Sequence, residues 1–174
     1  MKRVIQGLLI AFLLSTHWGN AYTQEGNFLT LPFSETLTLT QGWRYNVAIN
    51  PGVDPYKHEG IDWSCPEGTP ILAVADGLAV QWTQYDTTGK YGYGIFVLIK
   101  HPNGYYSLYA HLKKGADHIV KKATSTDSST WTPVSRGEII GFSGMTGTTV
   151  PHLHFEVRKE GIPVNPLSHL IKDY

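Results

Sequence analysis

The chain has 174 residues and a formal net charge of zero, with 14 basic and 14 acidic side chains. This charge balance gives no reason to expect nucleic acid as a partner. The length suits one domain with a sizeable hydrophobic core, and a single cysteine, Cys65, excludes a disulfide within the chain. We expect Cys65 to be a small buried apolar residue and not a reactive thiol.

Residues 1–21 are typical of a cleavable export signal. Lys2 and Arg3 precede an apolar run that ends at Leu14, and small residues follow up to Ala21. The run is too short for a membrane span, and the alternative, an uncleaved N-terminal anchor, has no stop-transfer segment to support it. Removing this segment leaves 12 basic and 14 acidic residues, a net charge of −2. We therefore predict an exported protein, periplasmic or extracellular, without stable membrane insertion after signal cleavage.

From residue 22 to residue 174 the pattern predicts a single domain. Short runs rich in branched and aromatic residues alternate with Gly, Pro and Asn, and no stretch sustains a long apolar face at helical spacing. Turns are expected at Asp76-Gly77 and at Pro102-Asn103-Gly104. In chain order, the expected strands lie in "TPILAVADGLAVQW", "GIFVLIKHPNGYYSLYAHL", "EIIGFSG" and "HLHFEVR". The predicted fold class is all-β from about residue 27 onward, with one short helical turn near "NPLSHLI".

A polar segment, "KKATSTDSSTWTP" at residues 121–133, interrupts the strand pattern, and we expect a surface loop there. An alternative places Trp131 beside a groove for an extended ligand. Two other segments, "GTPILAVADGLAV" and "RGEIIGFSGMTGTTV", look like two versions of one strand-turn-strand unit, as in carrier-type sandwich domains. A carrier needs a modifiable lysine at a hairpin tip, and neither unit offers one.

Two histidines one residue apart stand in the stretch "VPHLHFEV". In an extended chain, His152 and His154 point to the same face with their Cα atoms about 6–7 Å apart, so both imidazoles can serve one site. Upstream, "HEGIDW" supplies His58 and Asp62. Zinc accepts imidazole nitrogen and carboxylate oxygen, and a catalytic zinc keeps three protein ligands. His58, Asp62 and one histidine of the later pair would provide that set.

The spacing within "HEGIDW" restricts how these residues can meet. His58 and Asp62 would stand about 13 Å apart in a straight strand, so one shared ion requires a bend, which Gly60 permits. The helical zincin motif HExxH is absent, because its last position is Asp62 and glycine suits a helix poorly. A cupin site is excluded as well, since Glu156 comes too soon after the histidine pair.

The remaining histidines fall into two groups. His111 closes the expected strand "YYSLYAHL", where it can face a cleft; the alternative is a paired surface histidine on a hairpin. His101, His118 and His169 have no comparable partners, and we expect them on the surface.

Taken together, the chain resembles the lysostaphin-type, LytM-like zinc endopeptidases over roughly residues 40–170. The ordered segments that carry the resemblance are "HEGIDW", "GTPILAVADG", "YGYGIFVLIKHPNGYYSLYAHL", "VSRGEIIGFSGMTG", "PHLHFEV" and "GIPVNPL". It implies an antiparallel β-sheet or sandwich domain with a substrate groove, one zinc ion, and hydrolysis of peptide bonds in peptidoglycan. Val150 stands where glycine is common in the family, and the loop at residues 121–133 is longer than usual. Both departures bear on the choice of substrate more than on the chemistry of hydrolysis.

The same resemblance implies a role for each site residue. It assigns His58, Asp62 and His154 to the metal, and His111 and His152 to the two catalytic histidines that do not bind it. We therefore expect an exported zinc endopeptidase that acts as a monomer on the peptides of peptidoglycan. The alternative is a catalytically silent domain of the same fold that binds wall peptide or activates another hydrolase. Because all five positions are filled, the enzyme is favoured.

Overall fold

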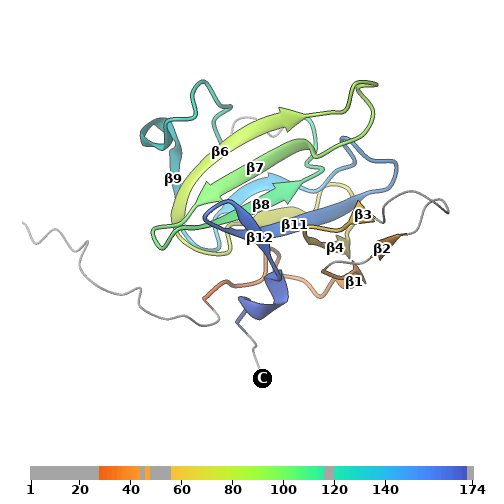
Figure 1. The fold of residues 1–174 in the computed structure, drawn as a ribbon, viewed down its shortest axis with the longest axis horizontal. Helices are drawn as coiled ribbons and strands as arrows, with labels where there is room; N and C mark the ends of the chain where they lie inside the picture. The colour runs from red at the N-terminus through yellow and green to blue at the C-terminus, as the bar shows by residue number, and fades with distance from the viewer. Residues whose placement is uncertain (1–27, 44–45, 48–55, 116–119, 172–174) are drawn as a thin grey trace, which may run out of the picture.

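The computed structural model describes residues 28–43, 46–47, 56–115 and 120–171 (Figure 1). The expected signal peptide, residues 1–21, and His118 lie outside these ranges. Among the described residues there is no apolar helix of membrane-spanning length.

An eight-stranded antiparallel sheet forms the body of the molecule, in the order β1-β4-β11-β8-β7-β6-β9, with β12 paired to β11. In Figure 1 the long strands β6, β7, β8 and β11 lie side by side. The strands are β1 (Thr38–Gln41), β4 (Ile61–Ser64), β6 (Gly77–Gln84), β7 (Gly94–Lys100), β8 (Tyr105–Ala110), β9 (Thr132–Val134), β11 (His152–Lys159) and β12 (Ile162–Val164).

Smaller elements complete the described chain. β5 (Pro70–Leu72) pairs with β10 (Ile139–Phe142), and β2 (Asn46–Val47) pairs with β3 (Tyr56–Lys57). Two short 3-10 helices are present, η1 (Ser128–Thr130) and η2 (Pro166–Ser168). The prediction of an all-β antiparallel fold is confirmed. The helical turn expected near "NPLSHLI" is η2, whose first turn is capped by the Asn165 side chain.

Strand β11 divides its side chains between two environments, as alternation in a strand requires. Leu153, Phe155 and Val157 are fully buried in the hydrophobic core. The residues between them, His154 and Glu156, therefore point to the opposite face of the sheet. The core also holds Ile61 and Trp63 of β4, Val97 and Ile99 of β7, Tyr109 of β8, and Cys65. Cys65 is buried and free, as predicted, and burial raises the pKa of its thiol.

The prediction that His101 lies on the surface is wrong. Its side chain is 3% exposed, and its Nδ1–H donates to the Asp76 carbonyl at 2.8 Å. Its Nε2 lies 2.9 Å from the Ser107 hydroxyl. Ser107 lies on the second strand of the same hairpin, whereas Asp76 lies 25 residues upstream, so the residues next to His101 give no sign of the carbonyl that it binds. His169 is half-buried, with its ring against those of Phe28 and Tyr105.

The Ser/Thr-rich segment is a surface loop, as predicted, that contains η1 and leads into β9. Its tryptophan bonds within the same loop, because the Trp131 indole N–H donates to the Ser125 carbonyl at 3.4 Å. β9 pairs with the first residues of β6, Gly77 to Ala79, at the end of the sheet where β8 begins. Trp131 directly precedes β9, and β6 and β7 stand between β9 and β8, so about 14 Å of sheet separates Trp131 from the strand that His111 follows. Trp131 therefore does not line the site that contains His111.

Candidate metal centre

Two of the predicted ligands face each other across neighbouring strands. His154 of β11 is paired with Asp62 of β4, and directly opposite residues in a sheet share a face. The His154 Nδ1 lies 2.8 Å from Asp62 Oδ1. Pairing thus brings together two residues that are far apart in the sequence.

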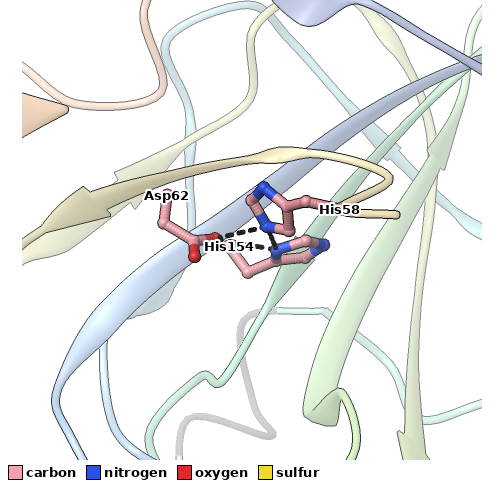
Figure 2. Close-up of side chains that lie close together, drawn as sticks. All are labelled: His58, Asp62 and His154. Atoms are coloured by element: carbon pink, nitrogen blue, oxygen red, sulfur yellow. Dashed lines mark hydrogen bonds and ion pairs between the residues drawn. The ribbon is translucent and has the colours of Figure 1, made fainter. Parts of the chain in front are cut away.

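A bend in the chain brings the third candidate ligand, His58, close to the other two. His58 lies just before Gly60, and its Nε2 is 3.2 Å from Asp62 Oδ1 and 3.0 Å from His154 Nδ1 (Figure 2). Gly60 is needed for space: a Cβ there would meet the Phe155 carbonyl oxygen and would lie 2.8 Å from His154 Cε1. The glycine was expected for its freedom to bend, and the structure adds that the chain crosses β11 too closely for any side chain.

These donor atoms form a compact set that fits zinc. One ligand atom from each of His58, Asp62 and His154 lies within 4.8 Å of the others, and all three residues are buried. The His58 Nδ1–H donates to the Gly42 carbonyl at 3.0 Å, which leaves Nε2 with a lone pair. The His154 Nε2 lies 3.0 Å from the Glu156 carboxylate, which places the proton on Nε2 and the lone pair on Nδ1.

With His154 neutral, three lone pairs converge within 3.2 Å of one another, an arrangement that calls for a cation among them, either a metal ion or an added proton. The electrostatics of the protein without metal agree. Burial would raise the pKa of Asp62, but bonds to His154 and His58 hold it well below its usual value. Burial would lower the pKa of His154, but bonds to Asp62 and Glu156 raise it to about 9. The site favours positive charge, and two nitrogens with one oxygen match the donors of zinc.

His152 stands beside this triad on the same strand face as His154. Its Nδ1–H donates to the Val150 carbonyl at 2.9 Å, so its Nε2 carries the lone pair when the ring is neutral. That nitrogen is 4.0 Å from Asp62 Oδ2, farther than the atoms of the triad are from one another. His152 thus borders the candidate metal position without belonging to the compact set.

His111 reaches the site through an unusual backbone conformation. Ala110 pairs with His154, so the next residue in a regular strand would point to the opposite face. His111 instead has a φ of 60°, in the left-handed region that non-glycine residues rarely adopt. Its ring then lies 4.5 Å from that of His152, between centroids. Strain of this kind, about 1–3 kcal/mol, is typical of functional positions.

The state of the His111 ring follows from its surroundings. Burial and the neighbouring charge of His152 lower the pKa of His111 to about 4, so the ring is neutral near pH 7. Its Nδ1–H donates to the Thr146 carbonyl at 2.9 Å. His111 and His152 therefore present the same tautomer, with an unprotonated Nε2.

All five predicted site residues come together in the structure, and their roles stay predictions. Sequence reasoning missed three residues: Glu156 and Tyr93, which contact His154, and Arg158, which binds both of them. Glu156 was considered only as a cupin ligand, although its position two residues after His154 already placed it on the same strand face. Nothing in the local sequence indicated Tyr93, which comes from the β6–β7 connection.

Comparison with known proteins shows which family the chain belongs to. The model of peptidase family M23 matches residues 56–166. The chain belongs to peptidase family M23. The predicted resemblance to the lysostaphin-type peptidases is thereby confirmed. A zinc-containing peptidase from Vibrio cholerae has a similar solved structure, with a TM-score of 0.63, 29% identity, and coverage of 84% of this chain and 40% of that one. The donor set of His58, Asp62 and His154 is of the kind that zinc accepts.

Two relatives extend the comparison. The DD-carboxypeptidase/endopeptidase Mpg of Neisseria meningitidis is 45% identical over 86% of this chain and 31% of its own length. The murein hydrolase activator NlpD of Salmonella typhimurium is 35% identical over 79% of this chain and 33% of its own length. The chain thus spans about a third of the curated relatives that it matches.

Proposed function

We propose that this chain is a zinc metalloendopeptidase that hydrolyses peptide bonds in peptidoglycan. The observation that carries the proposal is the convergence of three lone pairs from His58, Asp62 and His154, beside two histidines that do not join the set. Three protein ligands leave a coordination position open, as catalytic zinc sites do. Zinc held there would polarise a peptide carbonyl and lower the pKa of a water molecule to about 7.

The chain's own residues would handle the protons. His111 and His152 each anchor Nδ1 on a backbone carbonyl and keep Nε2 free to accept a proton. One of them can take a proton from the attacking water and, once protonated, donate it to the leaving amine. The fixed tautomers and the contact between the two rings support a shared role in this transfer.

The substrate and the compartment are part of the proposal. The similarity to a DD-carboxypeptidase/endopeptidase supports the peptide part of peptidoglycan as substrate. The signal-like residues 1–21 support export to the periplasm or the outside of the cell, where peptidoglycan lies. We further propose a single domain over residues 22–174 that acts as a monomer.

A second candidate is a silent domain that activates another hydrolase, favoured by the similarity to the murein hydrolase activator. Loss of ligands is the expected mark of such a domain. Here the three donor atoms and both neighbouring histidines are in place, which supports the enzyme.

The deciding experiment is digestion of wall sacculi that differ in cross-link chemistry by purified protein covering residues 22–174. We expect soluble fragments whose masses identify the bond that is cut. Chelator should abolish their release and added zinc should restore it, while His154→Ala serves as the matched inactive control. Absence of fragments from every sacculus, together with stimulation of an added wall hydrolase, would instead establish the activator.

A further inference from the structure

A second group of polar side chains lies behind His154, on the side away from the candidate metal position. Glu156 is fully buried, and both of its carboxylate oxygens have partners. Oε1 accepts from the His154 Nε2–H at 3.0 Å and from the Tyr93 hydroxyl at 2.5 Å. Oε2 accepts from the Arg158 Nε–H at 2.7 Å. The carboxylate therefore has no freedom to rotate away from His154.

The two outer members of this group support each other. Arg158 also donates from one terminal nitrogen to the Tyr93 hydroxyl at 3.2 Å and to Glu59 at 3.1 Å. The Tyr93 ring lies 5.7 Å from the His154 ring, between centroids. Arg158 is partly exposed, whereas Glu156 is shielded completely, so the charge that faces His154 is isolated from solvent. A bond to a charged acceptor is stronger in such surroundings than in water.

The two candidate histidine ligands use opposite nitrogens, and different partners determine which. The His58 Nδ1–H is held by a backbone carbonyl, that of Gly42, so Nε2 faces the metal position. The His154 Nε2–H is held by Glu156, so Nδ1 faces it. A neutral imidazole chooses its tautomer by the bond that the other nitrogen makes. Of the two ligands, His154 is the one whose tautomer depends on a side chain.

Tyr93 connects this group to the proton-handling side of the site. Its backbone carbonyl accepts from the His111 N–H at 2.9 Å, and its own N–H donates to the Gln84 side chain at 2.9 Å. One residue therefore touches the orienting carboxylate through its hydroxyl and the strained His111 through its backbone.

We propose that Glu156, held by Tyr93 and Arg158, is a positioning residue that keeps the proton of His154 on Nε2 and aims Nδ1 at the metal. The inference rests on the proposed zinc site and deepens it. Outer partners of this kind typically contribute 10- to 100-fold to metal affinity. The competing explanation is a buried ion pair, Glu156 with Arg158, that only stabilises the fold.

Zinc affinity separates these explanations. The zinc Kd of residues 22–174 is measured by competition with a chromophoric chelator for the unchanged protein and for Glu156→Gln, which keeps the side-chain volume. We expect a Kd weaker by about 10- to 100-fold. The visible absorption of the cobalt(II)-substituted protein should shift as well, because it reports ligand geometry. Thermal melting of the metal-free proteins shows whether the variant is folded.

Two further variants complete the test. Ser107→Ala removes a buried hydroxyl of β8 that does not touch His154, and it should lower stability with an unchanged zinc Kd. Tyr93→Phe keeps the ring and removes one bond to Glu156, so we expect a smaller loss, below about 10-fold. If Glu156→Gln fails to fold, Tyr93→Phe decides: a weaker Kd supports the inference and an unchanged Kd overturns it.

The remaining outcomes are distinct. A folded Glu156→Gln protein with unchanged zinc Kd and cobalt spectrum would overturn the positioning role and leave the proposed function standing. If the unchanged protein takes up no zinc, the proposed function itself is overturned.

Discussion

Two groups of buried polar side chains flank β8, and they use their hydrogen-bonding atoms in opposite ways. On the core-facing side of the strand, His101, Ser107 and Tyr109 form what we call the closed network. The His101 Nδ1–H donates to a carbonyl, so its Nε2 accepts from Ser107, which in turn accepts from Tyr109. The Tyr109 oxygen accepts from the Val74 N–H at 3.1 Å. Every donor of the closed network therefore has an acceptor.

On the opposite face, where Ala110 pairs with His154, the residues His58, Asp62 and His154 turn three acceptors toward one point. Both groups are buried and contain histidine, so neither burial nor the presence of histidine distinguishes them. The direction of the hydrogen bonds does. A network that satisfies itself stabilises a fold, whereas converging acceptors that take up an extra proton on His154 when no metal is bound are suited to hold a cation.

The largest expected effect comes from removing one of the three acceptors. His154→Ala or Asp62→Ala should lose zinc, and peptide hydrolysis should fall by at least about 10³-fold, because metal catalysis contributes several kcal/mol. Elemental analysis after dialysis and initial rates on wall peptide measure the two effects. Full zinc occupancy in Asp62→Ala would remove Asp62 from the ligand set and weaken the contrast between the two groups.

The next effect separates proton handling from metal binding. His152→Ala and His111→Ala should each retain zinc and slow hydrolysis by about 10²- to 10⁴-fold. The double variant should lose less than the product of the single losses, since the two rings act on one reaction. The same zinc analysis and rate assay apply. Loss of zinc from His152→Ala with retention in His154→Ala would show that the assignments within the pair are reversed.

A change in the closed network should lower stability and leave zinc binding and catalysis unchanged. Tyr109→Phe keeps the ring but leaves the Val74 N–H and the Ser107 hydroxyl short of a partner, at a cost of about 1–3 kcal/mol in the free energy of unfolding. Urea unfolding measures the cost, and zinc content and kcat should stay as in the unchanged protein. A large drop in kcat without a change in stability would contradict the structural role of this network.

A smaller effect concerns the left-handed backbone at His111. His111→Gly and His111→Ala both remove the imidazole and should be equally slow. The glycine variant should be more stable by about 1 kcal/mol, because only glycine adopts this φ without steric cost. Paired urea titrations give the difference. Equal stability of the two would mean that the residue relaxes to an ordinary φ when its side chain is absent.

The smallest effect is a pH dependence from His101. Burial lowers the pKa of His101 below its usual 6.5, so the unfolded chain binds the proton more readily than the folded one. Its contribution to stability is complete above pH 6.5 and is lost as the pH falls through the lower pKa of the folded state. The loss of stability between pH 7.5 and pH 5.5 should therefore be smaller in His101→Asn than in the unchanged protein, by urea unfolding with chelator present. An equal loss in both would argue against a neutral buried His101.

The sequence predicted the β fold and the members of the site, but not the polar supports around them. Alternation placed His152 and His154 on one face, and the spacing of His58 and Asp62 demanded a bend, which the structure has. These are local rules, and they hold because strand geometry is regular. The side-chain roles still require the measurements above.

What could not be predicted depends on contacts between distant segments. His101 looks like a turn residue until the Asp76 carbonyl, 25 residues upstream, is placed beside it. The left-handed φ of His111 is imposed by the surrounding structure, since nothing in "YAHL" favours it. Tyr93 meets Glu156 across 63 positions of sequence.

Strand β11 also connects correct folding with zinc uptake. His152, His154 and Glu156 alternate with Leu153, Phe155 and Val157, so a slip of one residue would turn the polar set into the hydrophobic core and the apolar set toward the candidate metal position. A chain with that error would present no acceptors opposite Asp62. Only correctly paired molecules would then retain the ion, so zinc retention would distinguish the native register of β11 from this error.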